Sequence, residues 1–333
     1  MRHRNIPIFI PHLGCPNQCV FCNQRSISGC REFCEEDVKG QIERALSTIS
    51  IGDEVEIAFF GGSFTGIDRG LMLRLLQTAQ AYVDAGRVTS IRLSTRPDYI
   101  SEEILEILSR FSVCTIELGL QSMDDAVLMR SKRGHTAKQA EDACRAIINH
   151  GFTLVGQMMI GLPASTRESE IETAKTIIAL GATAVRIYPT VVFYNTPLCD
   201  MAQNGDYTPL TTEEAITRSA DVLQIFEEKG IPCIRLGLCA TEDLTSPKEV
   251  FGGPNHPALG ELIMSECYYR RILSAVHERG LLGKEAVLRV PARELSRAVG
   301  QRRQNIKRLW EETQTHLQVK GDESAHTLQI EPI

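Results

Sequence analysis

The sequence predicts an α/β fold, a partial (β/α) barrel of six or seven units followed by a small C-terminal α+β module. Three observations predict it. Short apolar runs alternate with amphipathic stretches between residues 6 and 237. Glycine or polar residues follow almost every apolar run. Residues 285–333 change to a β-α-loop-α-β-β order.

The expected elements follow in chain order. Strands are expected at residues 6–13, 54–60, 90–95, 114–120, 153–160, 184–188 and 232–237. Helices are expected at residues 33–50, 70–84, 101–110 and 211–229, with two more opening at Thr136 and Ser165. Thr136 with Gln139 and Ser165 with Glu168 have the spacing of a capping box. Because strands separated by helices pair in parallel, their carboxyl ends meet at one edge, where reactive groups gather.

Composition is that of an ordinary globular chain. Of the 333 residues, 43% are hydrophobic and 23% are charged, and no apolar run approaches a membrane span. The net charge of −6 argues against a globally basic nucleic-acid binder. Eleven cysteines, without an apolar leader, favour reduced thiols in the cytoplasm.

Three cysteines follow the first expected strand. Cys15, Cys19 and Cys22 have C-x3-C-x2-C spacing, so one tight loop can direct three thiolates at a single group. Thiolates are the preferred ligands of iron–sulfur clusters, and three ligands leave one iron of a [4Fe-4S] cube open. The alternatives are inert buried thiols or a zinc site, for which Cys30 or Cys34 could supply the fourth ligand.

Polar groups follow several later strands. Gly61, Gly62 and Ser63 allow a ligand close to the backbone, although a plain turn has the same composition. Gln121 lies at a strand end, where a buried glutamine with ordinary partners is equally expected. Arg133 could form a bidentate interaction with a carboxylate, although a surface salt bridge is the simpler interpretation.

The cysteine loop, with Phe21 directly before Cys22, resembles the cluster loop of the radical S-adenosylmethionine (SAM) enzymes. In that family the open iron binds the methionine part of SAM. One electron then cleaves SAM to a 5′-deoxyadenosyl radical. The resemblance therefore implies a [4Fe-4S] cluster, SAM and a reducing electron donor protein.

Further stretches, in order, resemble the radical SAM domain of the Elongator catalytic-subunit family, which modifies wobble uridines of tRNA. They are Gly-Gly-Ser-Phe, Ser-Thr-Arg-Pro-Asp-Tyr, Glu-Leu-Gly-Leu-Gln-Ser, Arg-Gly-His-Thr, Met-Met-Ile-Gly-Leu-Pro and Ile-Tyr-Pro-Thr-Val-Val. By this resemblance Gly61, Gly62 and Ser63 hold the methionyl group of SAM. Ser94, Gln121, Arg133 and Gln157 line the ribose and carboxylate side. Phe21, Ile160 and Gly161 bound the adenine.

Two departures limit the resemblance. The Elongator subunit has a longer first gap between its cysteines, and it carries an acetyltransferase domain that residues 241–333 are too few to form. Acetyl-coenzyme A is therefore not expected. The stretches around Gln121, Arg133 and Gly161 also resemble oxygen-independent coproporphyrinogen oxidase, whose cluster loop has the short spacing found here. A tetrapyrrole or other small molecule is thus the alternative substrate.

The C-terminal module, expected at residues 285–333, resembles a K-homology RNA-binding module. Gly300 opens a loop like the G-x-x-G loop that clamps a nucleotide backbone, with Arg303 in place of the second glycine. Arg302, Arg303 and Lys307 form a local cationic surface suited to phosphates. A solvated helix surface in a small structural module is the simpler alternative.

These observations predict a radical SAM barrel at residues 1–240, a turn-rich helical extension at 241–284 and the small module after it. The expected function is reductive cleavage of SAM to act on a base of RNA, most specifically tRNA. The expected setting is the cytoplasm, with no membrane partner. A non-catalytic, metal-containing RNA-binding protein is the third possibility.

Overall fold

The computed structural model describes residues 3–10, 13–15, 19–23, 33–50, 52–238 and 248–333. They form two compact units. The first comprises Met1–Thr211 and Ile225–Pro257, and the second comprises Thr212–Gln224 and Ala258–Ile333. Among the described residues, no helix has both the length and the apolar character needed to cross a bilayer.

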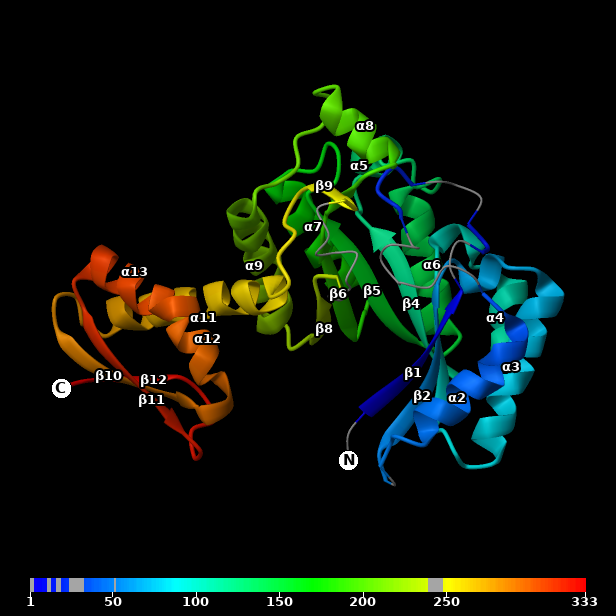
Figure 1. Cartoon of the computed structure of the whole chain (residues 1–333), viewed down its shortest axis with the longest axis horizontal. Helices are drawn as coiled ribbons and strands as arrows, with labels where there is room; N and C mark the ends of the chain where they lie inside the picture. The colour runs from blue at the N-terminus through cyan, green and yellow to red at the C-terminus, as the bar shows by residue number, and fades with distance from the viewer. Residues whose placement is uncertain (1–2, 11–12, 16–18, 24–32, 51, 239–247) are drawn as a thin grey trace. The chain divides into compact units, whose positions relative to one another are not determined.

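A seven-stranded parallel sheet forms the centre of the first unit (Figure 1), with strand order β1-β2-β3-β4-β5-β6-β8. The strands are β1 (His3–Ile10), β2 (Glu54–Gly61), β3 (Ser90–Thr95), β4 (Val113–Gln121), β5 (Thr153–Ile160), β6 (Ala184–Pro189) and β8 (Cys233–Leu236). Each strand of this sheet pairs in parallel with the sheet strand that follows it along the chain, as repeated βαβ units require. The predicted partial barrel is confirmed.

Helices and short turns connect the strands of this unit. They are η1 (Glu35–Asp37), α2 (Val38–Leu46), η2 (Phe64–Gly66), α3 (Arg69–Asp84), η3 (Pro97–Tyr99), α4 (Glu102–Leu108), α5 (Asp125–Arg130), α6 (Ala137–Asn149), α7 (Arg167–Ala179), α8 (Pro197–Gln203) and α9 (Thr212–Glu228), of which Thr212–Gln224 belongs to the second unit. A short antiparallel pair joins β7 (Val192–Phe193) to β9 (Val250–Gly252).

The two faces of the large sheet differ in chemistry. One face is apolar, and a Cβ added at Gly156 of this face would meet the Ile177 side chain of α7 at 2.8 Å. The helices therefore cover the apolar face. The opposite face carries charged and amide side chains in successive strands, and we call it the polar face. Its members in β2 to β6 include Glu56, Arg92, Glu117, Gln157 and Arg186.

Two local expectations need correction. The first strand ends at Ile10, and Leu13 lies in a turn. The helix expected to open at Ser165 has Thr166 as its N-cap, in a capping box with Ser169. The Ser165 hydroxyl is already engaged, because it donates to Glu170 Oε1 at 3.1 Å. The capping box of Thr136 with Gln139 is present as predicted. Helices α5 and α8 were not predicted.

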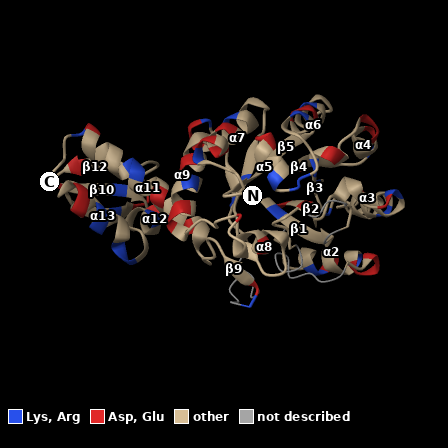
Figure 2. Ribbon diagram, turned by 90° about the horizontal axis from the view of Figure 1, so that it is seen from above, with Lys and Arg blue, Asp and Glu red and all other residues tan. Residues whose placement is uncertain are grey.

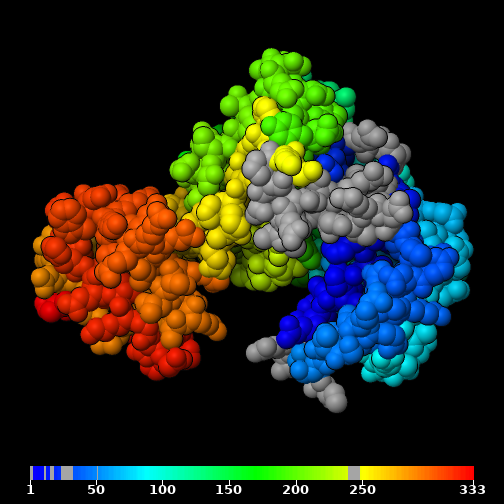
Figure 3. Space-filling view, in the orientation of Figure 1, coloured from blue at the N-terminus to red at the C-terminus, as the bar shows by residue number. Residues whose placement is uncertain are grey.

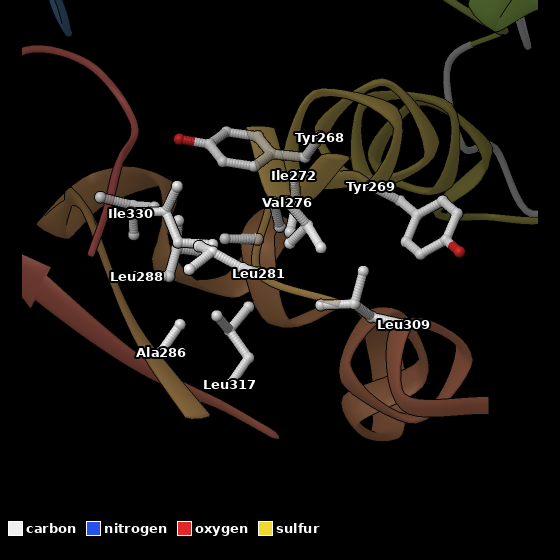
Figure 4. Close-up of a cluster of buried hydrophobic side chains, with 12 residues drawn as sticks. Tyr268, Tyr269, Ile272, Val276, Leu281, Ala286, Leu288, Leu309, Leu317 and Ile330 are labelled. Atoms are coloured by element: carbon white, nitrogen blue, oxygen red, sulfur yellow. The ribbon is translucent and has the colours of Figure 1, made fainter. Parts of the chain in front are cut away.

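In the second unit a three-stranded sheet of order β11-β10-β12 packs beneath helices. Its further elements are α11 (Leu259–Glu278), β10 (Glu285–Pro291), η4 (Ala292–Glu294), α12 (Leu295–Val299), η5 (Gln301–Arg303), α13 (Gln304–Thr313), β11 (His316–Asp322) and β12 (Gln329–Pro332). Strand β10 is parallel to β11 and antiparallel to β12. The second unit has its own apolar core, which includes Tyr269, Val276, Leu288 and Leu309 (Figure 4).

Candidate functional site

The cysteine loop follows the carboxyl end of β1. Cys19 is buried, whereas Cys15 and Cys22 are partly exposed, and all three are free thiols. Burial raises the pKa of the Cys15 thiol above its ordinary value, against the opposing charge of Arg96. Such a thiol keeps its proton at neutral pH until a metal displaces it.

In the described part of the chain, no group of three or more His, Cys, Asp or Glu side chains is placed to hold a metal ion. Of the two candidate fourth ligands for zinc, Cys34 is exposed and donates to Glu36 Oε2 at 3.0 Å, and Cys30 lies outside the described residues.

Backbone hydrogen bonds anchor the loop between Cys19 and Cys22. The Val20 amide donates to the Ser131 carbonyl at 3.2 Å, and the Leu198 amide donates to the Val20 carbonyl at 2.9 Å. Val20 is buried in a small apolar cluster against which Phe21 packs. Two distant segments of the chain, at Ser131 and Leu198, thus hold the backbone next to Cys19.

Two arginines donate to the sulfur of Cys19. Arg133 Nη1 lies 3.2 Å and Arg96 Nη1 lies 3.6 Å from Cys19 Sγ. Asp98 holds Arg96 through two hydrogen bonds of 2.9 and 2.8 Å. Arg96 Nη2 also contacts the Arg133 carbonyl oxygen. Cationic donors stabilise a thiolate, and hydrogen bonds to cluster sulfurs are one way in which proteins tune clusters.

The loop after β2 meets the cysteine loop backbone to backbone. A Cβ added at Gly62 would lie 2.1 Å from the Leu13 carbonyl oxygen, and one at Gly14 would lie 2.3 Å from the Ser63 carbonyl oxygen. The Gly62 amide donates to the Ile10 carbonyl at 2.8 Å. Only glycine fits at these two positions. The structure thus brings the predicted Gly61-Gly62-Ser63 stretch to the cysteine loop.

Two predicted ligand residues carry buried polar atoms without a partner among the described residues. They are Gln121 Oε1 and Arg133 Nε. Gln121 has a left-handed backbone with φ 66°, a conformation that non-glycine residues adopt mainly where the surroundings impose it. Both side chains lie beside Gly119, where an added Cβ would be 3.0 Å from Gln121 Nε2 and 3.3 Å from Arg133 Nη2. An acceptor for Arg133 and a donor for Gln121 are what a bound amino acid offers, so these residues fit SAM.

His135 is a third buried residue with unpartnered ring nitrogens. The carboxylate of Asp98 lies nearby, with Oδ1 3.9 Å from Nδ1 of the ring. Burial, reinforced by the charge of Arg133, lowers the pKa of His135 to about 4, against the opposing effect of Asp98. The imidazole is therefore neutral at pH 7.

An ion-pair network crosses the polar face of the sheet. Glu117 is fully buried and accepts from Arg92 Nη1 at 3.0 Å, Arg186 Nη2 at 2.8 Å and Gln157 Nε2 at 2.9 Å. Arg92 also donates to Glu56 Oε2 at 2.8 Å. The network fixes the amide of Gln157, which lies 3.4 Å from the Ser94 hydroxyl.

The remaining predicted contacts are occupied by protein partners. The buried Ser63 hydroxyl lies 2.8 Å from Thr95 Oγ1. The Ile160 side chain is fully buried, and its carbonyl accepts from the Thr190 hydroxyl at 2.7 Å. The Gly161 amide donates to Glu170 Oε1 at 2.6 Å.

The sequence offers Arg96 as a cation at a strand end, but sequence reasoning did not link it to Cys19, and it did not select Asp98 or the charges of the polar face. The sequence does contain a signal for the charges of the polar face, because charged residues occur within strands that are otherwise apolar and expected to be buried. Glu56, Arg92, Glu117 and Arg186 are such residues.

A second group of predicted residues lies in the second unit. Gly300 has φ 75°, and Arg302 and Arg303 have φ 51° and 63°, so the two arginines adopt a backbone typical of glycine. The buried Asn305 fixes the loop, since its Nδ2 lies 3.0 Å from the Arg297 carbonyl and 3.2 Å from the Ala298 carbonyl. Arg302, Arg303 and Lys307 are exposed. The ribbon in Figure 2 colours Lys and Arg residues of α12 and α13 blue.

Comparison with known families identifies two matching regions. Residues 9–177 match the model of the radical SAM superfamily. Residues 182–269 match the radical SAM C-terminal domain.

Curated relatives include proteins named for tRNA chemistry. The chain is 28% identical to an uncharacterized protein of Methanocaldococcus jannaschii, over 66% of this chain and 70% of that protein. It is 27% identical to the tRNA uridine(34) acetyltransferase of the same organism, over 54% of this chain and 37% of that protein. Elongator complex protein 3 of Schizosaccharomyces pombe is 24% identical, over 57% of this chain and 39% of that protein. The chain thus spans about two fifths of these two named relatives.

Solved structures share the fold. The Elp3 protein of Methanocaldococcus infernus matches with a TM-score of 0.61 and 20% identity, over 85% of this chain and 66% of that chain. Methylornithine synthase matches with a TM-score of 0.52 and 16% identity, over 77% of this chain and 76% of that chain.

Proposed function

We propose that this chain, which belongs to the radical SAM superfamily of enzymes, binds a [4Fe-4S] cluster on Cys15, Cys19 and Cys22 and uses it to cleave SAM. The observation that carries this proposal is the donor set, with three thiols on one loop and two guanidinium groups directed at Cys19 Sγ. When bound, the cluster and SAM supply one electron and a 5′-deoxyadenosyl radical.

The protein's part in this reaction is to bind and orient. In our proposal Gly61, Gly62 and Ser63 hold the methionyl group through backbone close to the cysteine loop. Gln121 and Arg133 bind its polar groups, and their unpartnered buried atoms support this role.

The rest of the proposed SAM site lies on the polar face of the sheet and at the carboxyl ends of its strands. Ser94 and Gln157 would contact the ribose, and the ion pairs of Glu117 keep the Gln157 amide in place. Phe21, Ile160 and Gly161 would bound the adenine. Cys19 and Arg133 are buried, so this part of the site is shielded from water.

We further propose that the substrate is a base of RNA, and specifically of tRNA. Two lines support this. The relatives named above include a tRNA uridine(34) acetyltransferase. In the second unit, Gly300, Arg302, Arg303 and Lys307 offer a local cationic surface for phosphates. We propose no acetyl-coenzyme A chemistry, and we expect a reducing electron donor protein in the cytoplasm, where the free cysteines remain reduced.

Iron binding tests the cluster. Full-length protein reconstituted anaerobically should bind about four irons and show a reducible cluster signal by electron paramagnetic resonance. The Cys15→Ala/Cys19→Ala/Cys22→Ala variant should lose both. The matched control is Cys144→Ala/Cys267→Ala, which removes two buried thiols outside the loop and should keep the iron. Equal iron in the triple variant and the unaltered protein would contradict the proposal, and zinc in place of iron would favour the non-catalytic alternative.

A further inference from the structure

A groove of about 650 Å³ lies along helix α13 and the edge strand β11 in the second unit. The surface of α12 and α13 is drawn in orange in Figure 3. The lining side chains that matter here are Arg303, Lys307, Trp310, Glu311, Glu285 and His316.

Trp310 is an exposed aromatic side chain in this groove. It is the single tryptophan of the chain, and 44% of it is exposed. The His316 ring is tilted by 53° against it with ring centroids 6.3 Å apart, so His316 does not stack on the indole. A large exposed aromatic face in a groove is the feature by which single-stranded nucleic acids are bound without strong sequence preference.

Arg303, the left-handed N-cap of α13, lines the same groove as Lys307 and Trp310. The three-residue spacing of Lys307 and Trp310 places these two side chains on the same helical face. The rise from Lys307 to Trp310 is about 4.5 Å along the axis. A phosphate held by the cations and a base held by the indole can therefore belong to one strand.

Arg303 and Lys307 lack the partners that the nearby Arg297 and Arg308 have. In the described residues, neither the Arg303 nor the Lys307 side chain makes an ion pair or hydrogen bond, and both are exposed. By contrast, Arg308 binds Glu266 at 2.6 Å and lies over the Tyr269 ring, and Arg297 binds Glu261 through two contacts of 3.0 Å. Charges left without a protein partner beside an aromatic face are available to a ligand.

We propose that this groove binds a single-stranded segment of RNA, with phosphates at Arg303 and Lys307 and one base stacked on Trp310. The inference rests on the proposed RNA substrate and adds to it a specific subsite. Glu285 and Glu311 lie among the lining residues, so they disfavour further phosphates and offer acceptors to base amino groups or ribose hydroxyls.

The single tryptophan makes a direct test possible. The full-length protein is titrated with a ten-nucleotide oligouridylate and, separately, with an RNA hairpin of equal charge. Stacking predicts saturable quenching of tryptophan fluorescence by the single strand. Quenching that is equal for the hairpin, or absent at saturation with the single strand, would contradict a base stacked on Trp310.

Variants separate stacking from charge. With fluorescently labelled oligouridylate, Trp310→Ala should weaken binding by about 5- to 150-fold without changing the dependence on salt. Trp310→Phe should keep most of the affinity. Arg303→Gln/Lys307→Gln should reduce the slope of log K against log salt by about 1.4. The control Leu282→Ala removes another exposed apolar side chain of this unit and should bind normally.

The outcomes distinguish this inference from the proposed function. Normal affinity in folded Trp310→Ala, together with a loss in Arg303→Gln/Lys307→Gln, removes the stacking subsite and leaves an RNA-binding surface. No RNA binding by the unaltered protein overturns both the groove and the RNA substrate. The iron measurement still decides the radical chemistry independently.

Discussion

Cys19 is the residue at which the electrostatics of the cysteine loop converge. It is buried, and the guanidinium groups of Arg96 and Arg133 both donate to its sulfur. Hydrogen bonds to the sulfurs that hold a cluster are one way in which proteins tune it. Asp98 holds Arg96 in position, so a carboxylate that does not touch the cysteine helps to define its surroundings.

Replacing Arg96 should destabilise the fold and the cluster together. Arg96→Gln leaves Asp98 without its cation and removes a donor from Cys19, so we expect a loss of about 3 kcal/mol in the free energy of unfolding. Urea unfolding measures the loss. The control Arg69→Gln breaks an exposed pair with Glu103 and should cost less than about 1 kcal/mol. Equal losses in the two variants would show that the buried contacts of Arg96 contribute nothing.

His135 should make stability depend on pH. Its pKa is lowered to about 4 in the folded protein, whereas an unperturbed histidine titrates near pH 6.5. The unfolded chain therefore binds the proton first. Stability is complete above about pH 6.5 and is lost as the pH falls towards 4, by about 2 kcal/mol between pH 7 and pH 5.

Urea unfolding of the metal-free protein at these two pH values tests the effect. His135→Asn should remove about 2 kcal/mol of the pH dependence. His277→Asn replaces an exposed histidine and should leave it unchanged. Identical pH dependence in the unaltered protein and His135→Asn would contradict a neutral buried imidazole.

At the scale of elements, the site depends on two loops that meet through their backbones. The loop after β2 and the cysteine loop after β1 approach at Gly62 and Gly14, where any side chain would strike a carbonyl oxygen. Adjacent parallel strands bring these loops to one edge of the sheet. The glycines allow the close approach there.

Gly62→Ala should separate these loops. The added methyl group would lie 2.1 Å from the Leu13 carbonyl oxygen, so the cysteine loop must shift. We expect the variant to retain less than half of the iron after anaerobic reconstitution. The control is Gly40→Ala in α2, since the added Cβ would meet only the flexible side-chain ends of Arg44 and Asp37. Full iron loading of Gly62→Ala would mean that the two loops move independently.

At the scale of the whole molecule, periodicity predicted the order of the large sheet and the elements of the second unit. Strand–helix alternation has few topological solutions, and it places strand ends at one edge. Cys15 and Gly62 were assigned to one site on that reasoning, and the structure brings their loops together.

The interior polar network was not predicted. The pairing of Arg92 with both Glu56 and Glu117 depends on which face each strand turns inward and on the register between strands. The contacts of Arg96 with Cys19 and Asp98 are likewise fixed by tertiary packing and not by local pattern. At Thr166 two adjacent hydroxyl residues compete for the cap, and the tertiary contact of Ser165 with Glu170 decides between them.

The production of 5′-deoxyadenosine tests the central claim most directly. The reconstituted full-length protein is given SAM and dithionite under anaerobic conditions, with and without bulk tRNA. We predict 5′-deoxyadenosine that increases when tRNA is added and is absent in the Cys15/Cys19/Cys22 triple alanine variant. An increase with a porphyrinogen but not with tRNA would contradict the RNA substrate. No 5′-deoxyadenosine from protein with an intact cluster would contradict the proposed reaction itself.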